Sequence, residues 1–362
     1  MPSLFDPLAL GALALPNRML MAPLTRGRAT KEAVPTPIMA DYYAQRAAAG
    51  LIISEATGIS REGLGWPYAP GLWNADQVEG WKPVTAAVHA AGGRIVAQLW
   101  HMGRLVHPDL GGGQPLSSSA TTAPDRAHTY EGKKPYVEAR AATRDDIARV
   151  TADYVRAARN AIAAGFDGVQ IHGANGYLID QFLRAGANHR DDAYGGSIDN
   201  RMRLMSEVLE AVGGAIGMDR TAIRFSPNIL SQGVVDPEPE ALFSAVAKRL
   251  EQLGVPWIEL REPRPGTSFG GEPSAPVSPA MREHFSGKII LNSDYVGATA
   301  QARLDEGVVD GIAFGRPFLA NPDLVERIRV GAPLNSPDPA TFYTPGPTGY
   351  LDYPPLREQA AA

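Results

Sequence analysis

Short apolar segments alternate with longer amphipathic segments along nearly the whole chain, and this alternation constrains the fold more than any other feature. The apolar segments have the length of buried strands, and the segments between them have the period of helices. We expect strands at residues 18–22, 51–55, 94–99, 168–172, 221–226, 257–261, 288–292 and 311–314. We expect helices at residues 37–49, 75–91, 143–164, 198–216, 239–253, 278–284, 298–306 and 321–330. Thr143 is a predicted N-cap, and Asn321 is expected to open a helix with Pro322 at its first position.

The repeated pairing of strand and helix predicts a (β/α)₈ TIM barrel of the α/β class. The 362 residues would form one domain, 1–362, because such barrels commonly reach this length undivided. A doubly wound sheet is the rival, and it would normally carry a glycine-rich turn after its first strand. Here Ala22-Pro23-Leu24-Thr25 follows that strand, which favours the barrel. A barrel has its active site at the carboxyl ends of the strands.

Several segments exceed a minimal barrel. Residues 8–15 alternate around Gly11 and predict an N-terminal hairpin that closes the barrel floor. Residues 100–142 and 263–279 lack a helical period, and we expect them to be long capping loops. We expect the tail from Pro333 to wrap the surface of the barrel.

Composition narrows the classes of partner and of chemistry. The formal net charge of −5 is mild, so nothing indicates nucleic acid or an anionic membrane as a partner. The lack of Cys excludes disulfides, Cys-ligated zinc, iron–sulfur clusters and thiolate nucleophiles. The N-terminus lacks the pattern of a signal peptide, and no apolar run approaches the ~18 residues that span a bilayer. We therefore expect a cytoplasmic protein, either a monomer or a homodimer.

The strongest candidate site follows the strand expected at 168–172. His172, Asn175 and Tyr177 are crowded there around Gly173 and Gly176, which allow a sharp turn. Two hydrogen-bond donors beside a phenol suit the polarisation of a carbonyl or nitro oxygen while a proton is delivered nearby. A lone His at a strand end can be a purely structural residue. Three such side chains in one turn favour a catalytic role.

Two further strand ends suit a phosphorylated ligand. The seventh expected strand ends at Asn292-Ser293-Asp294, and Gly315-Arg316 follows the eighth. Such barrels often bind a phosphate with the loops after these strands, where backbone amides and an Arg can hold the anion. An ordinary turn at Gly315 beside a surface Arg316 is the alternative.

Three other positions suit a flavin. Thr25, Gln98 and Arg224 supply an alcohol, an amide and a cation that would face one opening. The edge of an isoalloxazine needs such partners, and positive charge near N1 stabilises the anionic reduced ring. Together with the phosphate loop, these residues outline FMN.

With these residues in view, the sequence resembles the old yellow enzyme family of FMN-dependent ene-reductases from Leu4 to about Pro354. The resemblance is carried by the motifs Leu4-Phe5-Asp6-Pro7-Leu8, Met21-Ala22-Pro23-Leu24-Thr25-Arg26, Ala97-Gln98-Leu99-Trp100-His101, His172-Gly173-Ala174-Asn175-Gly176-Tyr177-Leu178 and Phe314-Gly315-Arg316-Pro317. The chain looks closest to the bacterial branch with N-ethylmaleimide and nitrate-ester reductases, because of residues 66–71 and 348–354.

The resemblance implies non-covalent FMN that NADH or NADPH reduces. Hydride from flavin N5 and a proton from Tyr177 would then reduce the C=C bond of an alkene activated by a carbonyl, imide or nitro group. The residues implied to bind FMN are Pro23, Leu24, Thr25, Ala56, Gln98, Arg224, Asn292, Ser293, Asp294, Gly315 and Arg316. Those implied to bind substrate are His172, Asn175, Tyr177, Trp66, Tyr68 and Trp100.

Two positions depart from the family pattern. Trp66 stands where many members have Tyr, so a pocket hydroxyl is missing unless Tyr68 replaces it. Asp294 stands where many members have a small residue. Because a carboxylate near a phosphate is unfavourable, we expect only the Asp294 backbone to contribute.

Three alternatives stay open beside alkene reduction. The same donors would hold a nitro group, so the reduction of nitrate esters or nitroaromatic compounds is a sister activity. A flavin-free barrel lyase acting on a sugar phosphate is more remote, because no Lys lies at the carboxyl end of an expected strand to form a Schiff base. A flavin-binding scaffold without activity would leave Tyr177 and the His172–Asn175 pair without a role.

Overall fold

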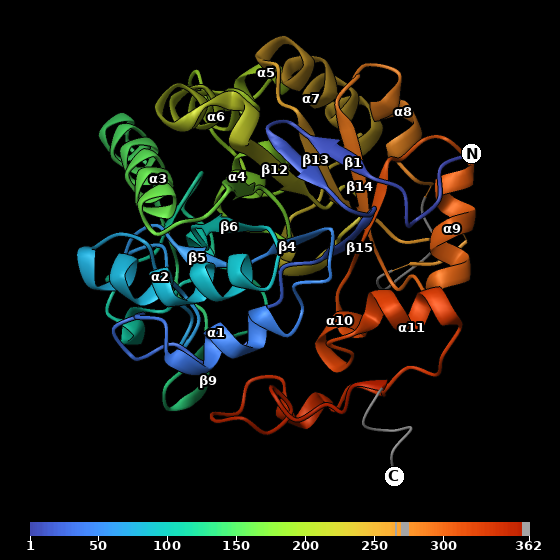
Figure 1. Cartoon of the computed structure of the whole chain (residues 1–362). Coiled ribbons are helices and arrows are strands. Elements are labelled where there is room, and N and C mark those ends of the chain that lie inside the picture. The colour runs from blue at the N-terminus through green and yellow to red at the C-terminus, as the bar shows by residue number, and fades with distance from the viewer. Residues whose placement is uncertain (265, 269–274, 357–362) are drawn as a thin grey trace.

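The computed structural model describes residues 1–264, 266–268 and 275–356. Parallel strands close into a barrel surrounded by helices, which confirms the predicted fold (Figure 1). The barrel strands are β3 (Met19–Met21), β4 (Leu51–Ile53), β6 (Ile95–Trp100), β11 (Gly168–His172), β12 (Thr221–Phe225), β13 (Trp257–Arg261), β14 (Lys288–Asn292) and β15 (Gly311–Phe314). Strand β15 pairs with β3 and β6 pairs with β11, and these pairings complete the ring. The short β5 (Thr57–Gly58) pairs with the end of β6.

The helices cover the outside of the barrel (Figure 1). They are α1 (Pro37–Ala44), α2 (Ala75–Ala90), α3 (Arg144–Ala163), α4 (Leu178–Leu183), α5 (Ile198–Arg201), α6 (Arg203–Ile216), α7 (Pro239–Leu253), α8 (Ser278–Arg282), α9 (Gly297–Asp305), α10 (Arg316–Ala320) and α11 (Leu324–Val330). Thr143 caps α3 as predicted. The helix expected to open at Asn321 is wrong in its start, because Asn321 is extended and ends α10, so that α11 begins only at Leu324.

The predicted N-terminal hairpin is confirmed by β1 (Leu8–Leu10) and β2 (Leu13–Leu15), which pair antiparallel. Gly11 at the turn has a φ of +58°, and a Cβ there would lie 2.1 Å from the carbonyl oxygen of Asp219. The Ala12 amide donates to that same oxygen at 3.0 Å, just before β12 begins. The hairpin leucines pack with the apolar residues inside the barrel. The hairpin therefore closes the amino-terminal end, the barrel floor.

The barrel interior changes from apolar to polar between the floor and the mouth. Residues such as Val96, Ala222, Trp257 and Ile290 form a buried apolar cluster with the hairpin leucines. Side chains two residues apart share a face of a strand, so the next inward positions lie one layer nearer the mouth. Those positions hold the buried polar residues Gln98, Arg224, Glu259 and Asn292.

The segment 100–142 is less irregular than expected. It contains η1 (Gly103–Leu105), η2 (Pro108–Leu110), β7 (Leu116–Ser117) paired with β10 (Arg140–Ala141), and a hairpin of β8 (Arg126–Thr129) and β9 (Gly132–Pro135). The elements η1 and η2 are 3₁₀ helices, and further 3₁₀ helices are η3 (Met218–Arg220), η4 (Ser231–Gly233) and η5 (Pro339–Thr341). The second expected loop, 263–279, lies partly outside the described residues.

The described part of the tail packs on the barrel. Tyr350 stacks on Tyr42 with ring centroids 4.0 Å apart, and Arg26 donates to the Gly349 carbonyl at 2.6 Å. Among the described helices, none is both long and apolar enough to cross a membrane.

Candidate active site

The turn after β11 brings His172, Asn175 and Tyr177 together. The backbone of Asn175 is left-handed, with a φ of +58°, and its backbone N–H donates to the Ser226 hydroxyl at 2.7 Å. This bond ties the turn to the residue that follows β12. The rings of His172 and Tyr177 meet edge to face with centroids 4.8 Å apart. The three side chains therefore share one small region at the barrel mouth.

His172 is a neutral hydrogen-bond donor in this setting. Its ring is buried, and burial together with the charges of Arg224 and Arg261 holds its pKa well below the usual 6.5. The Ala174 amide donates to His172 Nδ1 at 3.3 Å. A neutral imidazole with an accepting Nδ1 carries its hydrogen on Nε2. His172 Nε2 can therefore donate to a substrate oxygen.

The orientation of the Asn175 amide is set by a guanidinium. Arg261, the last residue of β13, donates to Asn175 Oδ1 at 3.0 Å. An Arg only donates, so the amide oxygen must face it. The NH₂ group of Asn175 is therefore directed away from Arg261, and it adds a second donor to that of His172.

Tyr177 keeps its proton over the physiological range. Burial is the main cause that raises its pKa, with smaller contributions from Tyr136 and Tyr343. Its ring meets that of Trp100 edge to face at 5.0 Å. Trp66, Tyr136 and Tyr177 pack as partly buried residues on the apolar cluster that contains Trp100. An apolar cluster beside a protonated phenol suits a weakly polar substrate.

A chain of buried polar contacts crosses the barrel below this turn. Gln98 Nε2 donates to Gln170 Oε1 at 2.7 Å, and Gln170 Nε2 donates to Glu259 Oε2 at 2.9 Å. Glu259 Oε1 lies 3.1 Å from Arg224 Nε in an ion pair. Arg224 Nη2 donates to Asn292 Oδ1 at 2.7 Å. We call these five residues the polar layer.

The ends of β14 and β15 enclose the cavity expected to hold a phosphate. It has a volume of about 360 Å³, and it is lined by Leu24, Arg261, Asn292, Ser293, Asp294, Gly315 and Arg316. The Arg316 side chain pairs with the Asp294 carboxylate, and both are more than half exposed. The Asn292 side chain instead bonds Arg224 and donates to the Ala313 carbonyl at 2.9 Å. The cavity is thus lined by two cations, Arg261 and Arg316, and by the Asp294 carboxylate that pairs with Arg316.

The remaining residues expected to bind FMN lie on neighbouring strands. Pro23, Leu24 and Thr25 follow β3 and are half-buried, and Ala56, just beyond β4, is buried. Gln98 and Arg224 belong to the polar layer. The contacts described above use Gln98 Nε2 and Arg224 Nε and Nη2, and they do not include Gln98 Oε1 or Arg224 Nη1. A polar rim with an acceptor, a cation and a separate phosphate cavity fits the FMN outlined by the sequence.

The two aromatic residues of segment 66–71 lie in different surroundings. Trp66 packs near Tyr177, and it also meets His128 and Tyr343 with ring centroids 4.2 and 5.1 Å away. Tyr68 is 45% exposed. It lines a separate cavity of about 410 Å³ together with Tyr343.

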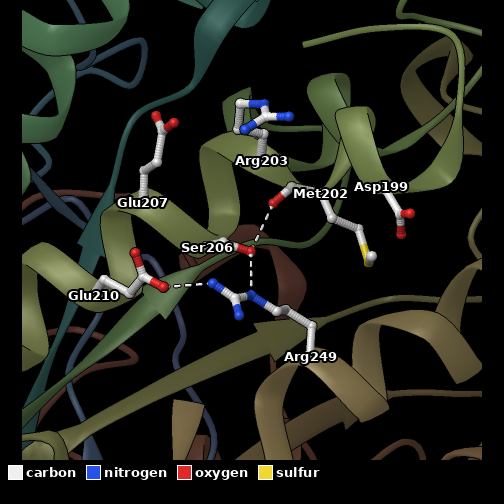
Figure 2. A pocket seen from close by; sticks show the side chains of 7 residues that line it. All are labelled: Asp199, Met202, Arg203, Ser206, Glu207, Glu210 and Arg249. Carbon is white, nitrogen blue, oxygen red and sulfur yellow. Dashed lines mark hydrogen bonds and ion pairs between the residues drawn. The ribbon is translucent and has the colours of Figure 1, made fainter. Parts of the chain in front are cut away.

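A further cavity lies on the helical exterior and not at the mouth. It has a volume of about 340 Å³ and lies among residues of α5, α6 and α7 (Figure 2). Arg249 there pairs with Glu210 and donates to the Ser206 hydroxyl at 3.2 Å (Figure 2). None of the residues expected to bind cofactor or substrate lines this cavity.

The sequence places Glu259 and Arg261 at the carboxyl end of an expected strand, but sequence reasoning gave neither them nor Gln170 a role in the site. Gln170 and Glu259 are fully buried inside strands, and Arg261 contacts Asn175. The available signal was a polar residue within an otherwise apolar strand. That signal becomes informative when the period of two places the residue inside the barrel.

Comparison with known proteins identifies the family. A model described as the NADH:flavin oxidoreductase / NADH oxidase family matches residues 3–335. The chain belongs to this family. It is 44% identical to a putative 12-oxophytodienoate reductase 3 of Oryza sativa subsp. japonica, over 98% of this chain and 93% of the relative.

Solved structures agree with this assignment. The old yellow enzyme homologue from Zymomonas mobilis has a TM-score of 0.96 and 57% identity, covering 98% of this chain and 99% of that chain. Morphinone reductase in complex with tetrahydroNAD has a TM-score of 0.92 and 46% identity, covering 98% of both chains. The resemblance to old yellow enzymes is therefore confirmed, and the chain is an FMN-dependent oxidoreductase.

Proposed function

We propose that the protein is an NADH- or NADPH-dependent ene-reductase that acts on alkenes activated by a carbonyl, imide or nitro group. FMN, held without a covalent link, would supply the hydride chemistry that connects the reduced nicotinamide to the β-carbon of the alkene. Gln98, Arg224 and Thr25 hold the flavin ring, with backbone contacts from residues 23, 24 and 56. Ser293, Gly315 and Arg316 hold its phosphate. Similarity to a reductase solved with a nicotinamide analogue supports the choice of reductant.

The observation that carries this proposal is the pairing of two neutral donors with a protonated phenol. His172 Nε2 and the Asn175 NH₂ group bind the activating oxygen and stabilise negative charge as it develops there. Tyr177 gives its proton to the α-carbon, because burial keeps the phenol protonated. Trp66 and Trp100 give the alkene an apolar surface.

Tyr177→Phe tests the proposal. Reduction of the flavin by NADH or NADPH needs no proton from Tyr177, so that half-reaction should stay nearly intact. Alkene reduction should slow by ~10²–10⁴-fold, the usual loss for a positioned general acid. Nitro reduction, which protonates no carbon, should be much less affected.

Stopped-flow traces of the two half-reactions make the comparison. Equal slowing of nitro and alkene turnover, with flavin reduction unimpaired, would make the phenol a substrate-binding group.

In denatured protein, FMN should separate from the chain, because no Cys is present to form a thioether. Flavin that stays with the precipitated chain would contradict non-covalent binding.

A further inference from the structure

The polar layer contains a buried carboxylate that the reaction itself does not require. Glu259 is fully buried, and it contacts Gln170 on one side and Arg224 on the other. Burial raises its pKa, while Arg224 and Gln170 act against that rise. A buried charge is costly unless it is paired and hydrogen-bonded. Glu259 has both kinds of partner, so its position calls for an explanation.

Glu259 sets the orientation of two side-chain amides, first that of Gln170 and through it that of Gln98. A carboxylate in an ion pair only accepts hydrogen bonds, so Gln170 must turn its NH₂ group toward Glu259. The Gln170 oxygen then faces the other way, where it accepts from Gln98 Nε2. One amide hydrogen of Gln98 is thereby engaged, and its oxygen is left to face a ligand.

The same carboxylate also acts on the cation across the barrel. Its oxygen lies 3.1 Å from Arg224 Nε, while Asn292 accepts from Arg224 Nη2. These two partners hold the guanidinium from two sides. The negative charge of Glu259 also offsets part of the positive field that Arg224 projects toward the mouth.

We propose that Glu259 is a positioning residue that orients Gln98 through Gln170, holds Arg224 directly, and lowers the reduction potential of the bound flavin. This inference rests on the proposed function, in which Gln98 and Arg224 hold the flavin edge. Without the carboxylate charge, the uncompensated cation should favour the anionic reduced ring. Glu259 would thus bring together two residues that lie on separate strands.

Glu259→Gln in the holoenzyme tests the charge. We expect the midpoint potential to rise by about 30 mV, equivalent to a tenfold gain in affinity for reduced over oxidised FMN in a two-electron couple. Arg224→Ala should lower the potential and weaken FMN binding by about 10- to 100-fold. The opposite signs separate an electrostatic role from general loss of structure.

Gln170→Met tests the relay, because it breaks the link to Gln98 and keeps the ion pair of Glu259 with Arg224. FMN should bind more weakly while its potential stays close to that of the wild type. Glu262→Gln is the matched control. Glu262 is also a buried carboxylate next to β13, but it accepts from the amides of Val277 and Ser278 outside the polar layer.

The outcomes separate failure of the inference from failure of the proposed function. If Arg224→Ala and Gln98→Ala leave both FMN affinity and potential unchanged, the proposed flavin site is wrong. If those two variants behave as expected but Glu259→Gln gives the same potential as Glu262→Gln, the role of Glu259 is overturned. A fall in potential in Glu259→Gln would overturn it as well. Should Glu259→Gln fold poorly, Glu259→Asp keeps the charge and should keep the wild-type potential.

Discussion

The two ends of the barrel are built from the same strands, but the interior is apolar at the floor and polar at the mouth. At the floor, leucines of β1 and β2 pack on Val96, Ala222 and other apolar residues. Two residues further along those strands, one layer nearer the mouth, the polar layer fills the barrel interior with amides and a buried ion pair. Of these two layers of side chains, the one nearer the mouth is polar, and the burial of its polar groups needs specific partners.

This contrast separates stability from function within one fold. Burial of apolar side chains at the floor is non-directional, so it depends on volume and shape. Hydrogen bonds at the mouth are directional, so each donor and acceptor constrains its neighbour. Changes at the floor should therefore alter unfolding and leave the flavin alone, whereas changes at the mouth should alter the flavin or the substrate.

The largest effect is expected from removing both oxygen-binding donors at the mouth with His172→Ala and Asn175→Ala. Loss of one such donor typically costs ~10²–10³-fold in rate, so the double variant should lose at least that much. Alkene and nitro substrates should both bind poorly and react slowly, unlike in Tyr177→Phe. Steady-state kinetics with both substrate classes measures this loss. Selective loss of alkene turnover alone would show that the pair does not hold the oxygen.

An intermediate effect is expected at the floor from Leu10→Ala. Leu10 is fully buried, so the substitution should lower the free energy of unfolding by about 2–5 kcal/mol. Denaturant unfolding of the holoenzyme measures this loss. The flavin spectrum and midpoint potential should stay unchanged under native conditions. A shift in potential as large as that of Glu259→Gln would break the separation between floor and mouth.

The smallest effect is expected from Arg261→Met, which removes the hydrogen bond to the side-chain oxygen of Asn175. Loss of one net hydrogen bond of about 0.5–1.5 kcal/mol should raise the KM for a carbonyl substrate from about twofold to about tenfold. Burial is the first cause that lowers the pKa of His172, and the Arg261 charge adds to it. Without the positive charge of Arg261, the charged form of His172 is less unfavourable. The pKa of His172 should therefore rise toward its usual value.

Substrate kinetics and an NMR titration of the His172 ring measure these two changes. Arg203→Met is the control, because Arg203 lies at the exterior cavity (Figure 2). It should change neither quantity. If the KM and the pKa of His172 both stay at their wild-type values in Arg261→Met, the contact with Asn175 has no role in substrate binding.

The sequence alone determined the barrel, the hairpin and the crowding of His172, Asn175 and Tyr177 in one turn. These features are local or periodic, so they can be read from the spacing of apolar residues and from glycines. The helices were predicted less accurately: α4 and α10 were missed, and α11 begins later than expected. The two missed helices border the site, because Tyr177 is the N-cap of α4 and Arg316 is the first residue of α10.

Only the tertiary structure decided which polar side chains meet. Gln98, Gln170, Glu259 and Arg224 lie on four neighbouring strands and are separated by as many as 161 positions, the difference between 259 and 98. Their contacts depend on the register of the closed barrel, which puts Gln170 beside Gln98 and Glu259 beside Arg224. Arg261 meets Asn175 for the same reason. No local pattern encodes such pairs, because each depends on how separate strands pair with one another.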